Sequence, residues 1–257
     1  MAQPYTVEAI VLRQRPLGEH DAIVVLLSRE RGKLSAVAKG VKRPHSKLAA
    51  VIQPFVWGRY FLARGGKMAL LTQGEVHESF YPLREDVWRV AYATYCCELL
   101  ERALPEAEPH PALFDLLRTT LTQLLRAEET MALAHSFELR ALALLGYEPD
   151  LERCLGCKGA VDGKRVFFSA ARGGLLCESC RDRDRQALPI CEGTVQYLRL
   201  LLHPGQTDLT RVKISGRSEG ELAAVLRAHI RYHLETEPRS ARFLRTLRAA
   251  ETDLLPG

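Results

Sequence analysis

The sequence predicts an α+β protein of several domains: an N-terminal OB-fold β-barrel, an all-helical domain, and a four-cysteine zinc module inserted among the helices. Three observations predict this: five short apolar runs within the first eighty residues, helical periodicity after residue 83, and two Cys-x-x-Cys pairs between residues 154 and 180. The length of 257 residues allows several small modules. We expect a barrel at 1–80, helices at 81–150, a zinc module at 151–188, and C-terminal helices at 189–257 that pack with the helical domain.

The first eighty residues have the pattern of a small closed sheet. Apolar runs at 7–13, 22–27, 34–38, 55–63 and 68–76 are strand candidates. The second and third runs flank a turn with Gly32 at the expected left-handed position, and the last two flank an Arg-Gly-Gly-Lys turn at 64–67. Five short strands in so few residues favour an OB-like barrel.

Helical periodicity dominates the segments on either side of the cysteines. Apolar residues recur at steps of three and four over 87–100, 113–125 and 132–145, and Gly146 stands where a helix stop is expected. Further helices are predicted at 194–202, 219–234 and 238–250, with Pro238 in the first turn of the last one. We expect Phe243, Leu244 and Leu247 to face inward from that helix.

Four of the seven cysteines have the spacing of a metal site. Cys154 and Cys157 form one pair, Cys177 and Cys180 form the other, and nineteen residues separate the pairs. Each pair can fold as a knuckle, and a hairpin between them would bring four thiolates to one structural Zn²⁺. Such a set leaves no coordination position for water, which disfavours zinc-dependent hydrolysis; a redox pair is the other alternative. Cys96, Cys97 and Cys191 are interpreted as small core residues.

Charge is concentrated at the N-terminus. Residues 1–80 carry twelve Lys plus Arg against six acids, a net charge of +6, while the whole chain carries +5. Such an excess attracts polyanions, although a basic module need not bind one. On an OB barrel, a basic loop at 39–47 and nearby aromatic rings suit a nucleic-acid strand. Aromatic candidates are Phe55, Trp57, Tyr60 and Phe61, each of which is at least as well explained by core filling.

Basic side chains from several segments are candidate DNA contacts. The last helix carries arginines at steps of three, for which a solvated face is the plain alternative. The candidates are Arg13, Lys39, Lys42, Arg43, Lys47, Arg64, Lys67, Arg242 and Arg245.

Several classes of protein are disfavoured by what the sequence lacks. Phosphate-binding glycine loops and the common hydrolase motifs do not occur. Zinc deaminases carry a His-x-Glu sequence before their cysteine pair, but the one His-x-Glu here, at 233–235, follows both pairs. We therefore expect no enzymatic activity and no small-molecule substrate. The sequence contains no apolar run of membrane-spanning length and no basic leader followed by an apolar stretch, so we expect a cytoplasmic protein without a membrane partner.

Several segments resemble the RecO family of bacterial DNA repair and recombination mediators. They are AIVLR at 9–13, PLGEHDAIV at 16–24, GKLSAVAKG at 32–40, QPF at 53–55, the four-cysteine insertion and SARFL at 240–244. The resemblance covers essentially the whole chain, and its N-terminal part is the most specific. His20 departs from the small polar residue that many relatives carry at this position.

The resemblance implies a function that composition and spacing do not supply. It implies binding of single- and double-stranded DNA, annealing of complementary strands and partnership with RecR. It also implies assistance to RecA loading on DNA coated by single-strand-binding protein, whose acidic C-terminal tail is a further expected partner. A nucleoid-associated location in bacterial cytoplasm follows. The alternative function is a zinc-containing protein-interaction adaptor without intrinsic annealing activity.

Overall fold

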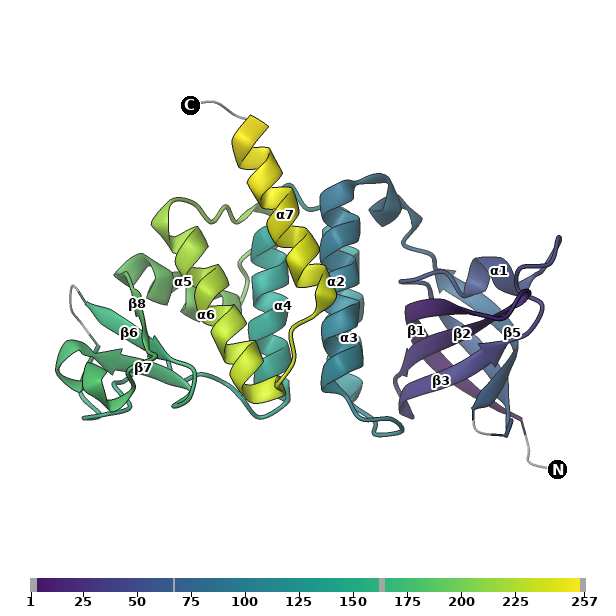
Figure 1. Cartoon of the computed structure of the whole chain (residues 1–257), viewed down its shortest axis with the longest axis horizontal. Helices are drawn as coiled ribbons and strands as arrows, with labels where there is room; N and C mark the ends of the chain where they lie inside the picture. Colours follow the sequence, from purple (N-terminus) through teal and green to yellow (C-terminus); the bar gives the residue numbers. More distant parts are fainter. Residues whose placement is uncertain (1–3, 67, 162–164, 255–257) are drawn as a thin grey trace. The chain divides into compact units, whose positions relative to one another are not determined.

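The computed structural model describes residues 4–66, 68–161 and 165–254. They form two compact units, whose helices and strands are labelled in Figure 1. The first comprises residues 1–125 and 238–257, and the second comprises residues 126–237. None of the described helices combines the length and the apolar character that crossing a membrane requires.

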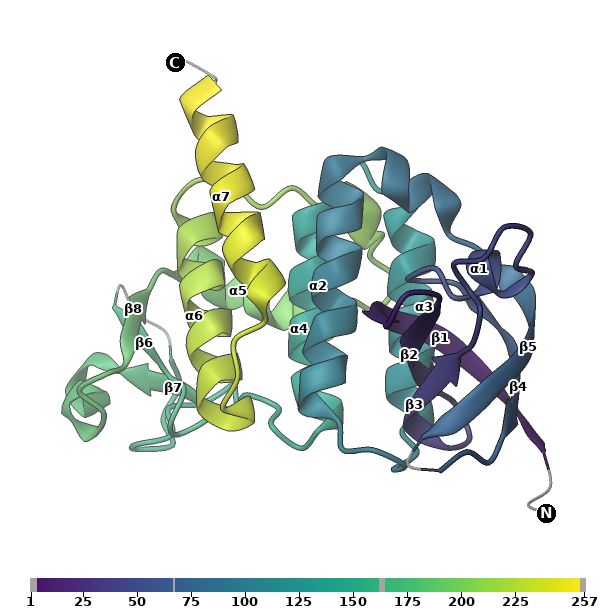
Figure 2. The same ribbon diagram turned by 45° about the vertical axis from the view of Figure 1, so that its right-hand side comes forward.

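The first unit begins with a five-stranded closed barrel of strand order β1-β2-β3-β5-β4 (Figure 2). The strands are β1 (Tyr5–Leu17), β2 (Asp21–Ser28), β3 (Gly32–Ala38), β4 (Trp57–Ala63) and β5 (Ala69–Glu78). All pairings are antiparallel except β3 with β5, which closes the barrel in parallel. The barrel and all five predicted strands are confirmed.

Inward side chains of alternate strand residues fill the barrel. Val7, Ala9 and Val11 of β1 pack with Val24 and Leu26 of β2, and all five are almost fully buried. The short helix α1 (Leu48–Val51) covers the barrel between β3 and β4, and Val51 joins the same core. Alternation is clearest in β4, where buried and more exposed residues take turns, whereas β2 is buried on both faces.

Three helices complete the first unit: α2 (Val87–Ala103), α3 (Pro111–Leu124) and α7 (Arg239–Leu254). The 3₁₀ helix η1 (Tyr81–Glu85) connects β5 to α2. The turn after β2 touches the connection between α2 and α3, where Ala107 N–H donates to Lys33 O at 2.9 Å. Gly32 has φ of +68°, and a Cβ there would collide with the backbone oxygen of Glu108. Glycine is therefore required at this turn both for its dihedral and for this close approach.

The second unit contains three helices and a small sheet. The helices are α4 (Thr130–Leu144), α5 (Glu192–Leu202) and α6 (Arg217–Leu234), and the sheet has the order β7-β6-β8. Its strands are β6 (Val166–Ser169), β7 (Gly174–Cys177) and β8 (Leu188–Ile190), with the 3₁₀ helices η2 (Glu178–Arg183) and η3 (Leu209–Arg211) nearby in sequence. Strand β8 was not anticipated because three residues, one of them proline, carry no readable alternation.

Gly146 ends α4 as predicted, with φ of +89°, and the predicted helices elsewhere in both units are present. The helical region and the four-cysteine cluster within it confirm the predicted fold class. The boundaries of the two compact units, at 125/126 and 237/238, fall inside the predicted modules 81–150 and 189–257, and the four module ranges stay a prediction.

Candidate nucleic-acid interface and metal centre

The loop at 39–47, between β3 and α1, presents four basic side chains. Lys39, Lys42, Arg43 and Lys47 are all exposed, and we call them the cationic loop. The backbone beneath them is fixed to the β1–β2 turn: Gly40 N–H donates to Asp21 Oδ1 at 2.7 Å, and Lys42 N–H donates to His20 O at 3.0 Å. Val41 is 6% exposed and belongs to the barrel core. The loop is therefore anchored while its charges remain in solvent.

The four charges of the cationic loop have no carboxylate partner in the part of the chain that the structure describes. Among the described residues, no carboxylate lies within ion-pair distance of any of the four. By contrast, Arg29 lies 3.0 Å from Asp115, and Arg59 lies 3.7 Å from Glu75. Four unpaired positive charges thus lie on one short loop, where they would attract a polyanion.

Two other predicted barrel residues lie apart from the cationic loop. Arg13 Nη2 is 2.5 Å from Glu101 Oε1 of α2, so its charge is neutralised within the first unit. Arg64 is exposed in the β4–β5 turn, near the beginning of β1, because Leu62 pairs with Tyr5. The cationic loop is fixed near the other end of β1. Lys67, the remaining predicted residue of that turn, lies outside the described residues.

Arg15 is a basic residue of this region that the sequence analysis did not select. It is exposed near the end of β1, and together with Lys42 it lines a pocket. The sequence does contain a usable indication, since Arg15 follows Arg13 by two residues and therefore shares its face of the strand.

The predicted stacking aromatics divide into two groups. Phe55 and Tyr60 are 2% and 0% exposed, so both serve the core. Burial raises the pKa of the Tyr60 hydroxyl, which lies 2.9 Å from Val51 O. Trp57 and Phe61 are half-buried, and Trp57 Nε1 donates to Glu8 Oε1 at 2.8 Å. Only these last two rings present part of their surface to solvent.

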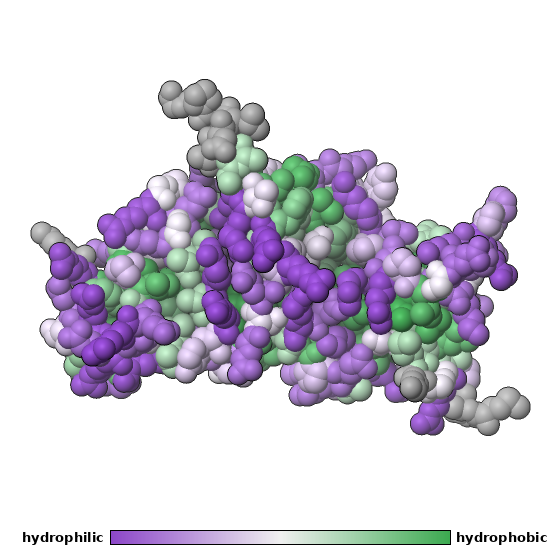
Figure 3. Space-filling view, in the orientation of Figure 1, coloured by the Kyte–Doolittle hydropathy of each residue, from purple (hydrophilic) through white to green (hydrophobic). Residues whose placement is uncertain are grey.

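Helix α7 carries Arg242 and Arg245, and both are exposed. Hydrophilic side chains gather on this face where α7 begins (Figure 3). The predicted inward face is correct for Leu244, which is 8% exposed, and wrong for Phe243, which is 51% exposed. The adjacent positions 243 and 244 lie about 100° apart around a helix, so a single contact with α2 buries one and leaves the other in solvent. Leu247 is half-buried.

Glu98 of α2 fixes the start of α7. Its carboxylate accepts from Ser240 N–H and Ser240 Oγ at 2.9 and 2.6 Å, and from Arg239 N–H at 2.9 Å. Burial alone would raise the pKa of Glu98, but these hydrogen bonds and that of Arg102 outweigh burial and lower it. The carboxylate thus satisfies N–H groups that a helix start leaves without intrahelical partners.

We expect the Glu98→Ala variant to loosen α7 selectively. Hydrogen bonds to a charged group contribute roughly 2 kcal/mol, which corresponds to about thirtyfold faster amide exchange over 239–250. Exchange measured by mass spectrometry checks this, with Glu85→Ala as the control because Glu85 is an exposed acid of the same unit. Equal exchange in both variants would contradict the capping role.

The four predicted metal ligands come together in the second unit. The sulfur atoms of Cys154, Cys157, Cys177 and Cys180 all lie within 4.8 Å of one another, and Cys157 Sγ is 3.8 Å from Cys177 Sγ. A tetrahedral ion with bonds of about 2.3 Å requires sulfur separations of about 3.8 Å. The β6–β7 hairpin carries the chain from the first pair to the second, as predicted. The donor set therefore fits a tetrahedral, thiophilic metal ion such as Zn²⁺.

Local backbone geometry favours a thiolate at Cys154. Burial opposes ionisation, but N–H groups including those of Cys177 and Gly156, each 3.3 Å from the sulfur, lower its pKa to about 6. Gly156 is required for space as well, because a Cβ there would lie 2.6 Å from Cys180 Sγ. Metal ligation needs thiolates; the surroundings favour one at Cys154, whereas burial raises the pKa of Cys177 and of Cys180.

The remaining cysteines differ from the prediction in one case. Cys96 and Cys97 are buried in α2, and burial raises the pKa of Cys97. Cys191, however, is half-buried and stands directly before α5 as its N-cap, with Sγ 3.3 Å from Thr194 Oγ1. Its interpretation as a core residue is wrong because the apolar helical pattern begins after it.

Two histidines of α6 connect this helix to the segment before the first cysteine pair and to the β6–β7 turn between the two pairs. His229 Nε2 lies 2.9 Å from Tyr147 O, and His233 Nε2 lies 3.1 Å from Ala170 O. The two rings contact each other edge to face, and His229 also contacts Phe168. Burial lowers the pKa of His229 to about 4, with a smaller contribution from the neighbouring His233.

This depressed pKa predicts a specific acid sensitivity. The unfolded chain takes up a proton on His229 at about pH 6.5 and the folded chain only near pH 4, so stability is full above 6.5 and falls between these values. From pH 7 to pH 5 this one group accounts for about 2 kcal/mol. We expect the unfolding free energy of His229→Gln to fall by that much less than that of the wild type over this interval. Equal losses in denaturant titrations would contradict this assignment.

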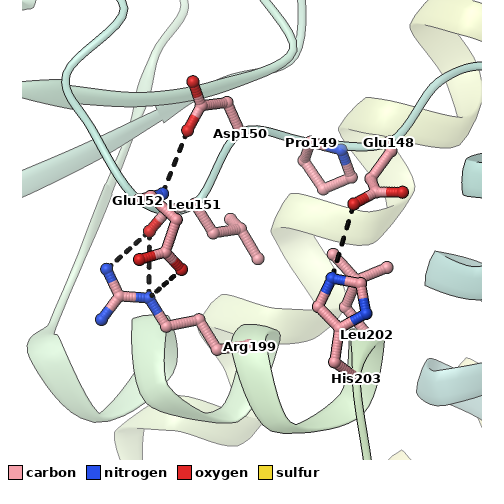
Figure 4. Close-up of a pocket in the computed structure, with 8 residues that line it drawn as sticks. All are labelled: Glu148, Pro149, Asp150, Leu151, Glu152, Arg199, Leu202 and His203. Carbon is pink, nitrogen blue, oxygen red and sulfur yellow. Dashed lines mark hydrogen bonds and ion pairs between the residues drawn. The ribbon is translucent and has the colours of Figure 1, made fainter. Parts of the chain in front are cut away.

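A pocket of about 350 Å³ lies where the segment after α4 passes α5 (Figure 4). Two of its carboxylates lie close to basic side chains: Glu148 Oε1 is 3.4 Å from His203 Nε2, and Glu152 Oε1 is 3.3 Å from Arg199 Nε. Arg199 also donates to Leu151 O. With Asp150, three carboxylates line this pocket, which makes it unfavourable for a polyanion.

Comparisons with known proteins identify the family. Residues 1–80 match the family model described as Recombination protein O N terminal, and residues 84–242 match that described as Recombination protein O C terminal. This chain belongs to the RecO family. DNA repair protein RecO of Pelotomaculum thermopropionicum is 40% identical over 93% of this chain and 93% of its own length. The RecO proteins of Desulforudis audaxviator and Bacillus subtilis are 41% and 34% identical.

The matches to RecO extend over nearly the whole of both chains. The alignment with the Desulforudis protein spans 95% of this chain and 97% of that protein, and the alignment with the Bacillus protein spans 92% of each. Both the barrel with its cationic loop and the helical region with the four cysteines thus fall within the RecO models. The predicted family is confirmed.

Proposed function

We propose that this RecO-family protein binds single- and double-stranded DNA through its barrel and anneals complementary strands. The observation that carries this proposal is the cationic loop. Its four basic side chains are exposed and have no ion-pair partners among the described residues, and the loop is anchored to an OB-type barrel. Contacts from lysine and arginine to phosphates supply affinity without reading sequence.

Annealing by this route needs no energy source, because base pairing is itself favourable. Two strands repel each other through their phosphates, and cations at the cationic loop lower that repulsion while the bases remain available for pairing. We propose accordingly that the protein acts as a mediator without a catalytic centre of its own.

We propose that the four thiolates hold one structural Zn²⁺. The donors present are Cys154, Cys157, Cys177 and Cys180, and a full set of four protein ligands gives a closed coordination sphere. Bound zinc supplies folding stability to a loop-rich segment with a small apolar core. The β6–β7 hairpin and the β8 pairing depend on this segment being ordered.

The family further suggests the partners. We propose that the protein works with RecR and with the acidic tail of single-strand-binding protein to assist RecA loading on coated DNA. This assigns it to the bacterial cytoplasm, beside the nucleoid. Exposed Arg242 and Arg245 are candidates for the acidic tail, and titration of the fluorescent tail peptide against Arg242→Glu/Arg245→Glu tests them.

An annealing assay tests the proposal most simply. Two complementary labelled oligonucleotides are mixed at low concentration, without nucleotide cofactor, with and without the purified protein. We expect the protein to accelerate duplex formation at least tenfold. No acceleration, together with intact binding of RecR, would favour the adaptor function instead.

A further inference from the structure

A pocket of about 350 Å³ opens at the end of the barrel beside the cationic loop. Its walls come from the ends of β1 and β2, from the loop at 39–47, from α1 and from Gln53. Its volume lies at the lower end of the range for small-molecule sites. Of the predicted DNA-contacting residues, only Lys42 lines the pocket, so the pocket is distinct from the set of charges that forms the cationic loop.

The pocket is formed by fixed parts of the barrel. Ala22 and Val41 contribute apolar wall and are 4% and 6% exposed, and both belong to the barrel core. The hydrogen bonds of Gly40 and Lys42 to the β1–β2 turn hold the loop that carries Val41. An occupant would therefore meet a site that is already shaped, which lowers the entropic cost of binding.

Two side-chain amides stand together in this pocket. Gln14 Nε2 donates to Gln53 Oε1 at 3.3 Å, and Gln53 Nε2 donates to Ala49 O at 2.8 Å. An amide offers two N–H donors and a carbonyl acceptor, so each nitrogen keeps one N–H available, and the Gln14 carbonyl has no recorded donor among the described residues. Adjacent donors and acceptors of this kind complement the hydrogen-bonding edge of a nucleobase.

The two charged residues that line this pocket, Arg15 and Lys42, are both positive. Arg15 and Lys42 are exposed at the rim, and no carboxylate lines the pocket. Neither Arg15 nor Lys42 has an ion-pair partner among the described residues. A neutral hydrogen-bonding wall next to two cations fits a nucleotide, whose base is neutral and whose phosphate is anionic.

We propose that this pocket takes one unstacked nucleotide of a bound DNA strand, with the base against Gln14 and Gln53 and the phosphate against Arg15 and Lys42. The inference rests on the proposed DNA binding and adds a base-holding site to it. Because an amide can present either its oxygen or its nitrogen, the pocket accepts more than one kind of base.

The test compares strands with and without bases. Affinities of the full chain are measured by fluorescence anisotropy for a thymidine oligonucleotide and for an abasic strand of equal length. We expect the wild type to prefer the strand with bases by about tenfold, and Gln14→Ala/Gln53→Ala to reduce this preference to about twofold while it binds the abasic strand as the wild type does. Gln14→Leu, which keeps the side chain's bulk, should also reduce the preference, and Gln73→Ala, an exposed amide on β5, should not.

The outcomes separate this inference from the proposed function. An unchanged tenfold preference in the double variant and in Gln14→Leu would overturn the base pocket while leaving DNA binding intact. Failure of the wild type to bind either strand would overturn the proposed function. The last measurement is a titration with thymidine monophosphate. If the free nucleotide bound as tightly as the thymidine oligonucleotide, the assignment of the pocket to a nucleotide of a DNA strand would be overturned.

Discussion

Reversing the charge of the cationic loop is expected to lower affinity for single-stranded DNA by about 500-fold at 0.1 M salt. The change is Lys39→Glu, Lys42→Glu, Arg43→Glu and Lys47→Glu in one variant. Each phosphate contact on a single strand contributes about 0.7 to the slope of the logarithm of the association constant against that of the salt concentration. The loss of four contacts therefore lowers the association constant by nearly three orders of magnitude at about 0.1 M salt. The loss should be similar for all sequences, because phosphate contacts carry no base information.

The control for this variant carries the same change in net charge at another place. Arg126, Arg211, Lys213 and Arg217 are exposed residues of the second unit, and their reversal to Glu changes total charge equally. Anisotropy titrations with two unrelated oligonucleotides should show a small effect for this control. Equal losses in both variants would mean that overall charge matters rather than the loop, and a loss confined to one oligonucleotide would mean base readout.

Removal of a cysteine ligand is the second large effect expected. Metal binding to structural four-thiolate sites is worth about 10 kcal/mol or more in small modules, which is more than the core of residues 151–190 can replace. We expect the wild type to bind one zinc ion per chain and Cys177→Ser to bind less than a tenth of that. Proteolytic cleavage within 151–190 should accelerate at least 100-fold.

Cys191→Ser is the matched control, because Cys191 lies outside the cluster and is half-buried. It should keep both the metal and the slow cleavage. Addition of a zinc chelator to the wild type should reproduce the behaviour of Cys177→Ser. A chelated wild-type protein that resists proteolysis as well as the untreated one would contradict the structural role of the metal.

The parts of the fold predicted from sequence are those with strong local patterns. Alternation in the first eighty residues indicated five strands, and Gly32 indicated the turn in which it has positive φ. The cysteine spacing alone predicted that the four sulfur atoms lie close together, because a hairpin brings the Cys-x-x-Cys pairs at its two ends next to each other.

The features that were missed depend on contacts between segments distant in sequence. Arg13 and Arg15 have the same local pattern, yet Glu101, 88 residues away, neutralises only Arg13. Phe243 is exposed because α7 contacts α2 along a narrow line, and the start of α7 depends on Glu98, 142 residues from Ser240. No local periodicity encodes such pairings.

The salt dependence of DNA binding tests the account most directly. The affinity of the wild type for a single-stranded oligonucleotide is measured from about 50 to 400 mM salt, and the logarithm of the association constant is plotted against that of the salt concentration. About ten phosphate contacts predict a slope of about −7, and the charge-reversed cationic loop should reduce its magnitude by about 3. A flat plot, or one that the loop variant leaves unchanged, would contradict the claim that the cationic loop binds the DNA backbone.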